Sequence, residues 1–454
     1  MFDPTQMILL IVVLMAMVLS GIHIAVALLF TAFLGLYLMQ GDLGVASTFI
    51  SNSAYEVIRD YVFAVIPLFM LMGEFLAKCG AASDLFAVVQ RATKWMPGRL
   101  AVATVFANAI FAFITGVSIA AAAAFSRIVW PEMKKYGYER KFGLSCICGS
   151  ACLGMLIPPS VLMIVWGVIT EVSIGSLFVA GVIPGFMVVT AFVIYILFVA
   201  FLQPHRVGEA ARVVKASPVG AAVVNAAPPP LAEPDDLKGK TISTLLVMAL
   251  VIGTLAGIWL GVFTPTEGAG VGCALSMLMA VYKGVRLKEI FEVILSVGRT
   301  LAPLLLLLVS AQIYSRVLSM TGITGAAKAL FIGSGLDPWQ VFALMVVVWL
   351  ILGCLIDSIS IILLTVPVFH PVAVALGFDP IAFAIMGIIA IEVGFMTPPF
   401  GMLVFTVKAA LPEENVSTTE LFAGTVPYMI SLLAVIVIIY VFPITATYLL
   451  TVGR

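Results

Sequence analysis

Residues 154–160 read GMLIPPS, and residues 394–400, which lie 240 positions further along the chain, read GFMTPPF. Both copies sit inside long apolar stretches. A proline lacks an amide hydrogen and its ring clashes with the carbonyl four residues earlier, so a Pro-Pro pair breaks an α-helix and frees backbone carbonyls. Within a bilayer such a break is tolerated only where protein, water or a ligand satisfies these groups. The two copies therefore predict two broken helices inside a membrane protein.

The composition of the chain supports a membrane location. Of its 454 residues, 63% are hydrophobic and 10% are charged, against ~25% charged residues in a typical soluble domain. Lys+Arg and Asp+Glu number 23 each, which excludes the basic excess of a nucleic-acid binder. The apolar runs are continuous and lack the alternation of a membrane β-barrel. We predict an all-α polytopic membrane protein, whose N-terminal apolar run is a first span because no basic region or cleavage site accompanies it.

Basic residues are concentrated in a few connections between the twelve apolar segments. Eighteen of the 23 Lys and Arg lie in four stretches, which are 78–99, 127–141, 203–240 and 283–299. The positive-inside rule places these stretches in the cytoplasm.

Two apolar segments then begin and end on the same side of the membrane. Segment 100–126 lies between two basic stretches, so we expect a re-entrant hairpin with its tip near Gly116. Segment 339–365 lies between connections that carry a single Lys, and we expect a second hairpin from the opposite face with its tip near Asp357. The other segments give ten crossings, among them the broken helices 142–170 and 380–410.

A shift of 240 residues aligns the two halves of the chain. It places Ser118 on Ser358, Gly154 on Gly394 and Pro158 on Pro398, with Pro131 on Pro371 and Gly137 on Gly377. Each half reads as three spans, a hairpin, a broken span and a final span. Five crossings is an odd number, so the halves insert with opposite orientation, which is typical of alternating-access transporters. We expect a first repeat at 1–202, a proline-containing cytoplasmic linker at 203–240 and a second repeat at 241–454.

The hairpin tips and the Pro-Pro breaks are the candidate binding regions, because hydroxyls and freed carbonyls are hard oxygen ligands suited to Na⁺. Half-helix N-termini also favour an anionic substrate. The alternative for each hydroxyl is a bond back to its own helix. The expected first cation site uses Thr115, Gly116, Ser118, Gly154 and Pro158, and the second uses Asp357, Ser358, Ser360, Gly394, Thr397 and Pro398. The expected substrate contacts are Ser118, Ser160, Ser358 and Thr397.

Few charged side chains lie within the apolar segments. Glu74 and Glu267 lie near span ends, where a structural role is expected. Asp357 could bind a cation, carry a proton or cap a half-helix. Glu392 falls in the second broken helix without an assigned role. Arg316 could snorkel to the interface, contact another subunit or bind a carboxylate substrate.

Several mechanisms are disfavoured by what the sequence lacks. The chain has no ATPase signature, so an ion gradient is the expected energy source. Its three His residues are dispersed and its six Cys show no CxxC pair, so we expect neither an enzyme nor a metal–redox centre.

Six motifs together resemble one family, the large membrane subunit of tripartite ATP-independent periplasmic (TRAP) transporters, or DctM-like proteins. These motifs are GVSIA at 116–120, PEM with GY at 131–138, LIPPS at 156–160, AGVIPG at 180–185, FTPTE at 263–267 and TPPFG at 397–401.

The resemblance implies a Na⁺-coupled importer of an organic anion in a bacterial inner membrane, with both termini periplasmic. It also implies a small four-span partner subunit (DctQ-like), a periplasmic substrate-binding protein (DctP-like) and an elevator-type cycle. C4-dicarboxylates, sialic acid and other carboxylates are the implied substrates. The alternatives are a stand-alone Na⁺- or H⁺-coupled carboxylate symporter of the same superfamily and, in a different class, a membrane-embedded enzyme or a channel.

Overall fold

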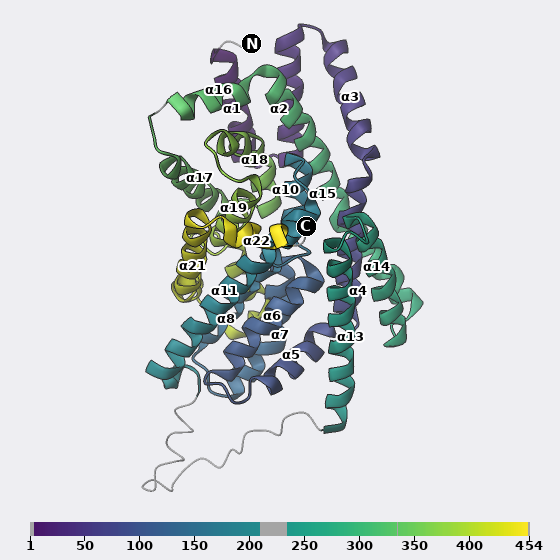
Figure 1. Ribbon diagram of the computed structural model, residues 1–454, viewed down its shortest axis with the longest axis vertical. Coiled ribbons are helices and arrows are strands. Elements are labelled where there is room, and N and C mark those ends of the chain that lie inside the picture. The colour runs from purple at the N-terminus through teal and green to yellow at the C-terminus, as the bar shows by residue number, and fades with distance from the viewer. Residues whose placement is uncertain (1–3, 209–233, 334, 453–454) are drawn as a thin grey trace.

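The computed structural model describes residues 4–208, 234–333 and 335–452, and these residues fold into α-helices joined by short turns (Figure 1). The helices of the first half are α1 (Pro4–Leu19), α2 (Ile24–Gln40), α3 (Leu43–Arg59), α4 (Val65–Lys78), α5 (Ala81–Ala92), α6 (Arg99–Thr115), α7 (Ser118–Lys135), α8 (Arg140–Ala151), α9 (Leu153–Leu156), α10 (Val161–Thr170) and α11 (Ile174–Leu202). Those of the second half are α13 (Pro234–Trp259), α14 (Pro265–Tyr282), α15 (Leu287–Thr321), α16 (Ile323–Gly333), α17 (Pro338–Gly353), α18 (Ser358–Ala375), α19 (Pro380–Gly394), α20 (Met402–Ala410), α21 (Thr418–Val441) and α22 (Ile444–Val452).

Helices break at the positions that the sequence predicts. The first hairpin is formed by α6 and α7, which separate at Gly116 and Val117, and the second by α17 and α18, which separate at residues 354–357. The LIPPS stretch divides α9 from α10, and the second Pro-Pro loop divides α19 from α20. Both Pro-Pro bonds are cis. The prediction of an all-α polytopic fold is confirmed.

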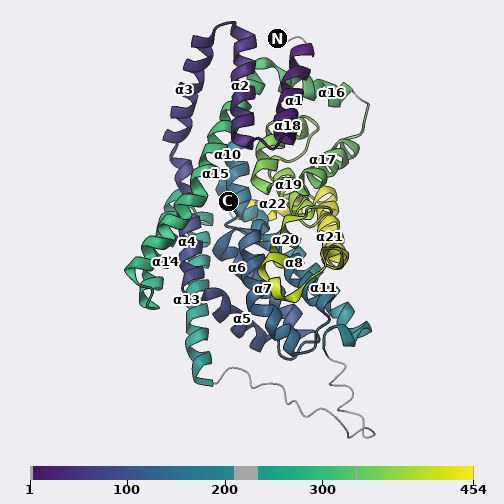
Figure 2. The same ribbon diagram turned by 180° about the vertical axis from the view of Figure 1, so that it is seen from behind.

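The helices of the two halves begin and end at equivalent positions. A shift of 240 residues places α7 on α18 over the full length of both helices. The same shift places α6 on α17, α8 on α19, and α10 on α20 to within a few residues. In Figures 1 and 2 the first hairpin lies in the lower part of the molecule and the second in the upper part. The two hairpins therefore approach the centre from opposite ends.

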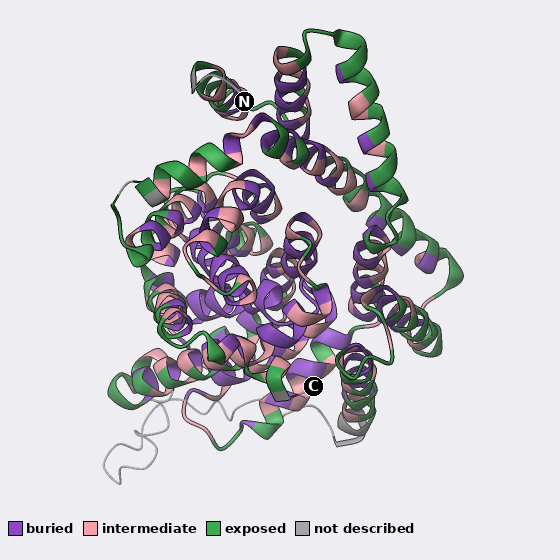
Figure 3. Cartoon of the chain, turned by 45° about the horizontal axis from the view of Figure 1, so that its top comes forward, coloured by how far each residue is buried: buried purple, intermediate pink, exposed green. Residues whose placement is uncertain are grey.

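Two groups of helices differ in how deeply they are buried. An outer wall contains α3, α4, α13, α14 and α15, which follow one side of the molecule in both views (Figures 1 and 2). Within it α4 packs on α14, and α15 packs on α2. Figure 3 shows buried residues gathered in a central cluster, whereas the outer helices are exposed along much of their length. The 18-residue apolar window of Arg140–Thr170 is 100% buried inside the protein, against 33% for Leu287–Thr321. The first broken helix therefore lies at the centre.

The central cluster is assembled from elements of both halves. The second arm of the first hairpin, α7, packs against α20, and the second arm of the second hairpin, α18, packs against α10. In the same way α8 contacts α21, and α19 contacts α11. Since α7 is equivalent to α18 and α20 to α10, the contact of α7 with α20 corresponds to that of α18 with α10. Each hairpin is held by a broken helix of the opposite half.

Some elements differ from the sequence-based expectations. Helix α3 was not expected. The sequence pattern of 284–297 predicts an amphipathic surface helix, but this segment forms the first turns of α15, which continues without interruption to Thr321. The last expected span is divided into α21 and α22 at Phe442 and Pro443.

The crossing number and the boundaries of the two repeats stay predictions. Seven helical segments of the described chain are long and apolar enough to cross a membrane, and five further apolar helices are 10–17 residues long. Residues 209–233 of the expected linker lie outside the described residues.

Candidate functional site

The tip of the first hairpin rests on the Pro-Pro break of the same half. Gly116 ends α6 with φ +61°, and its amide donates to Ala112 O over 3.0 Å. A Cβ atom at Gly116 would collide with the carbonyl oxygen of Pro159. The amide of Val161 donates to Gly116 O over 3.3 Å. Glycine is required here both by the left-handed backbone and by the close approach of the loop.

Gly154 gives the hairpin tip a second close contact. A Cβ atom at this position would lie 2.9 Å from the backbone nitrogen of Ser118. The expected site residues Gly116, Ser118, Gly154 and Pro158 are thus brought into one region. The fifth, Thr115, donates its hydroxyl to Phe111 O over 3.3 Å, as a helical threonine commonly does.

Ser118 joins the two halves of the protein. Its side chain is fully buried and donates to Glu392 Oε2 over 2.7 Å, while Cys152 O lies 3.4 Å from the same hydroxyl. Glu392 is 1% exposed, and its Oε1 atom has no hydrogen-bond partner among the described residues. The sequence placed this carboxylate in the broken helix α19 but did not connect it with Ser118, because the two residues are 274 positions apart.

Ser160 has a structural role in this geometry. It is the N-cap of α10 and accepts from the amide of Met163 over 3.4 Å, while its hydroxyl donates to Met155 O. Both bonds satisfy backbone groups that the Pro-Pro break leaves open. Ser160 is also fully buried, so a substrate contact would require it to move.

The second hairpin tip is organised by Asp357. This residue is the N-cap of α18, accepts from the amide of Ser360 over 3.0 Å and also accepts from the Ser360 hydroxyl. Ser358 and Ser360 are buried at 3% and 2% exposure. The cap satisfies one of the orphan amides of the half-helix, which is the structural alternative considered for Asp357.

The second Pro-Pro loop meets the second hairpin at a different point from the one expected. Gly394 packs against Gly353, at the end of α17, so closely that a Cβ on Gly394 would lie 2.8 Å from Gly353 Cα. Thr397, in the loop after α19, donates back to Val393 O at the end of that helix over 2.9 Å. Pro398 follows in the loop. The hydrogen bonds of Asp357 therefore stay inside the hairpin, and those of Thr397 stay inside α19 and its extension.

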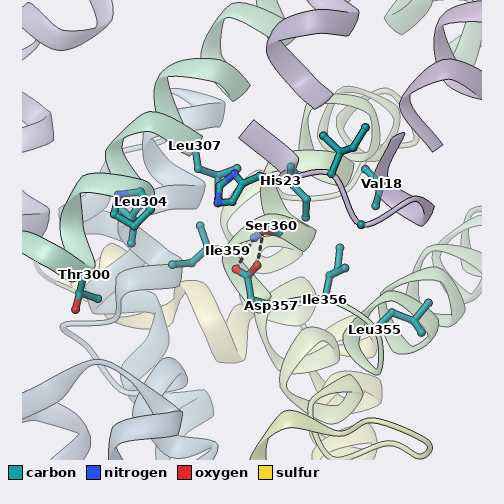
Figure 4. Close-up of a pocket in the computed structure, with 14 residues that line it drawn as sticks. Val18, His23, Thr300, Leu304, Leu307, Leu355, Ile356, Asp357, Ile359 and Ser360 are labelled. Atoms are coloured by element: carbon teal, nitrogen blue, oxygen red, sulfur yellow. Dashed lines mark hydrogen bonds between the residues drawn. The ribbon is translucent and has the colours of Figure 1, made fainter. Parts of the chain in front are cut away.

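A cavity of about 480 Å³ lies between the second hairpin tip, the turn that joins α1 to α2, and the middle of α15. Its polar lining includes His23, Thr300, Asp357 and Ser360 (Figure 4). His23 Nδ1 accepts from the amide of Ala25 over 3.3 Å, so in the neutral imidazole the proton is on Nε2. The sequence suggested no basic side chain near the hairpin tips, because His23 comes from a turn more than 330 residues away from Asp357.

Three other polar residues considered from the sequence, Glu267, Gln312 and Arg316, have partners within the protein. Glu267 forms a capping box with Thr264 at the start of α14, while Glu74 is exposed on α4. Arg316 Nη1 lies 2.6 Å from Glu56 Oε2 on α3. Gln312 donates to Val168 O over 2.7 Å. The six cysteines are free.

The fold and this site define a class of protein. Two hairpins with opposed tips, each held by a broken helix, form the architecture of membrane transporters in which broken helices of two repeats surround a central binding region. The chain belongs to the family described as "Tripartite ATP-independent periplasmic transporter, DctM component", whose model matches residues 11–445. The resemblance drawn from the motifs is confirmed, and the chain is a transporter permease subunit and not an enzyme.

Similar proteins carry names of several transported compounds. The chain is 32% identical over 391 residues to the C4-dicarboxylate TRAP transporter large permease protein DctM of Pseudomonas aeruginosa, with 86% of each chain covered. It is 27% identical to the ectoine permease TeaC of Halomonas elongata, with 95% of this chain and 96% of that protein covered. It is 25% identical to the sialic acid permease SiaM of Vibrio cholerae, with 93% of each chain covered.

A solved structure shares the fold. The YdaH transporter of Alcanivorax borkumensis, described as having an unusual topology, superposes with a TM-score of 0.59 at 17% identity and covers 89% of both chains.

Proposed function

We propose that this permease subunit imports an organic anion across a bacterial inner membrane in symport with Na⁺, after a periplasmic binding protein has delivered the anion. The observation that carries the proposal is the pair of hairpins at equivalent positions, each seated against a Pro-Pro break or its adjoining helix end. Such interruptions place half-helix termini and buried oxygen atoms near the middle of the protein. The family membership adds that the chain works within a tripartite transporter.

The oxygen atoms at the first hairpin support Na⁺ as the coupling ion. The Ser118 hydroxyl, the Cys152 carbonyl and the Glu392 carboxylate meet in a buried region, and one carboxylate oxygen is orphaned. Oxygen donors of this kind suit hard cations. Residues Gly116, Gly154 and Pro158 shape the same region. We expect Na⁺ to bind there, and we expect a second ion near Asp357, Ser358, Ser360, Gly394, Thr397 and Pro398.

The cavity at the second hairpin tip supports an anionic substrate. It is bounded on one side by the N-terminus of α18 and on the other by His23 and Thr300. Amides of a half-helix N-terminus and the Nε2–H of His23 can donate to a carboxylate. The relatives are named for C4-dicarboxylate, ectoine and sialic acid, compounds that each contain a carboxylate. Ser118, Ser160, Ser358 and Thr397 would line the path between the breaks once the hairpins move.

The division into outer wall and central cluster supports an elevator-type cycle. The hairpins and broken helices share their contacts across the two halves, so they would move as one body along the outer wall of α3, α4, α13, α14 and α15. A small DctQ-like subunit and a DctP-like binding protein would complete the transporter. In the proposed orientation the stretch 203–240 is cytoplasmic and both termini are periplasmic.

Reconstitution into liposomes tests this proposal. We expect uptake of a labelled carboxylate only when the partner subunits, the cognate binding protein and an inward Na⁺ gradient are all present. Replacing Na⁺ by choline should abolish uptake. Uptake by this chain alone, without the binding protein, would instead support a stand-alone carboxylate symporter, and uptake driven by a pH gradient in choline would assign the coupling to protons.

A further inference from the structure

We propose that Glu392 is a ligand of the cation at the first hairpin, so that this cation site is built from both halves of the chain. The inference rests on the Na⁺ coupling proposed above. Glu392 reaches from α19 to the tip between α6 and α7, where Ser118 donates to its Oε2 atom over 2.7 Å. Its Oε1 atom is buried and has no hydrogen-bond partner within the described part of the chain. This atom is the open ligand position of the site.

Within the described part of the chain, the helices that pack around Glu392 carry no permanently cationic side chain. None of the helices that pack on α19, namely α9, α10, α11, α17, α18, α21 and α22, contains a Lys or Arg within its bounds. Their titratable residues include His370 and Tyr428, and Cys152 directly precedes α9. His370 contacts Phe383 near the other end of α19. Helix α7 carries Arg127, but nine residues beyond Ser118, which is ~14 Å along the helix axis. A carboxylate that is 1% exposed and lacks a cationic partner is strongly disfavoured.

Hydrogen-bond counting also indicates a deficit of donors at this tip. A serine hydroxyl has one hydrogen, yet Ser118 Oγ lies within reach of both Glu392 Oε2 and Cys152 O. Two acceptors thus share one donor, and Oε1 remains without any. A metal cation satisfies several oxygen atoms at once and balances the charge of the carboxylate. An excess of oxygen acceptors around a buried carboxylate is therefore what a cation site requires.

The ligand set has a consequence for coupling. Ser118 belongs to the first hairpin and Glu392 to the second broken helix, and the two are 274 positions apart. A cation held between them joins the halves at the point where the hairpin tip meets α19. Release of the cation would leave the tip attached there by one hydrogen bond to an uncompensated charge.

Cation binding by the purified chain, without substrate or binding protein, tests the inference. The midpoint of thermal unfolding is measured as NaCl replaces choline chloride at constant ionic strength, because a ligand that binds the folded state stabilises it by an amount that rises with the logarithm of its concentration relative to its Kd. We compare the wild type with Glu392→Gln, which keeps the size of the side chain and one acceptor oxygen but removes its charge. Glu74→Gln is the matched control, because it neutralises an exposed carboxylate on the membrane-spanning helix α4. Glu392→Asp keeps the charge on a shorter side chain.

We expect the Na⁺ concentration that produces a given rise in the unfolding midpoint to increase by at least ~10-fold in Glu392→Gln, equivalent to ~1.4 kcal/mol, and to stay unchanged in Glu74→Gln. Glu392→Asp should fall between the wild type and Glu392→Gln, and it serves as the test if the glutamine variant does not fold. An unchanged Na⁺ response in Glu392→Gln or Glu392→Asp would overturn the inference and leave Na⁺ coupling intact. A wild type that Na⁺ does not stabilise would instead refute the proposed Na⁺ coupling, and the inference with it.

Discussion

Two glycines without a Cβ atom allow the hairpins to lie close to the broken helices. Gly154 lies against the backbone of Ser118, and Gly394 lies against Gly353. At both positions a methyl group would have to displace backbone and not the end of a flexible side chain. Backbone in a packed core moves only with the helices to which it belongs. The two glycines therefore fix the distance between a broken helix and its hairpin.

Gly154→Ala is expected to destabilise the protein and to reduce transport, since its Cβ would lie 2.9 Å from Ser118 N. Overpacking of this kind costs ~1–3 kcal/mol. Thermal unfolding in detergent and Na⁺-dependent uptake measure the two effects. Gly270→Ala is the control, because the added Cβ in α14 meets nothing within 4 Å and alanine favours a helix by ~0.5–1 kcal/mol. Equal stability of the two variants would contradict the proposed close packing.

Ser118→Ala and Ser358→Ala are expected to differ in stability although the residues are equivalent in the repeat. Loss of the Ser118 hydroxyl removes the donor to the buried Glu392 carboxylate, which costs ~1–3 kcal/mol. Ser358 begins α18 behind the Asp357 cap, so its loss should cost less. Both variants should require more Na⁺ for half-maximal uptake, as measured in liposomes. Unchanged Na⁺ dependence in both would remove these hydroxyls from the cation sites.

At the scale of the elements, the sequence predicted helix breaks better than helix lengths. Gly116 and the Pro-Pro pairs act through local backbone geometry, so their effect is visible in the sequence. Helix α3 was missed because polar residues such as Ser51 and Asn52 interrupt its apolar pattern. Helix α15 was divided because Lys288, Glu289 and Glu292 suggested a surface segment. Whether such a segment continues into a span depends on its neighbours, which the sequence does not place.

An ion pair between α15 and α3 accounts for the charged residue Arg316, so that no substrate contact is needed to explain it. Arg316 Nη1 lies 2.6 Å from Glu56 Oε2, and the two side chains are 42% and 63% exposed. Exposed ion pairs contribute ~0.2–1 kcal/mol. We expect a double-mutant cycle of Arg316→Ala and Glu56→Ala to give a coupling energy in this range, with the KM for uptake unchanged. A large increase in KM in Arg316→Ala alone would show that this residue contacts the substrate.

A second inter-element pair predicts a pH dependence. The hydrogen bond from Lys134, at the end of α7, lowers the pKa of Glu414 in the 3₁₀ turn η3 (Pro412–Glu414) below its ordinary value of 4.5. A lowered pKa means that the ionised carboxylate stabilises the folded protein above pH 4.5 and that this stabilisation is lost as the pH falls further. The effect is small because Lys134 is 62% exposed. Thermal unfolding at stepwise lower pH should show a weaker acid-induced decrease in Glu414→Gln than in the wild type.

For the whole molecule, the shift of 240 residues was the most informative feature of the sequence. It placed equivalent helices in both halves, because Gly116 and the two Pro-Pro pairs interrupt helices through local backbone geometry. It did not reveal that Ser118 meets Glu392 or that His23 lines the cavity at Asp357. These contacts depend on how the halves interlock, and the repeat specifies only what each half contains. Thr397 was expected to share a site with Asp357, but its hydroxyl donates to Val393 O, four residues earlier in the chain.

Because each hairpin packs against a broken helix of the opposite half, we predict that neither half is stable alone. Co-expression of 1–220 with 221–454, a division within the expected linker, should give a complex that co-purifies and unfolds cooperatively, because α7 requires α20 and α10 requires α18. Each half expressed alone should be degraded or aggregate. Affinity purification through a tag on one half measures the association. A stable, monodisperse first half would show that its contacts with the second half are dispensable.

The pairing of each hairpin with a broken helix of the opposite half also has a consequence for biosynthesis. Helix α7 ends at Lys135, but its partner α20 begins at Met402, so a ribosome that adds ~5–20 residues per second needs roughly 13–53 s to complete the contact. During this interval the tip at Gly116 can already rest on the Pro-Pro loop of its own half, but the face of α7 that α20 covers in the folded protein has no partner. The nascent chain therefore needs a temporary partner for this helix face, and an insertase or chaperone in the membrane is the kind of factor that can supply it.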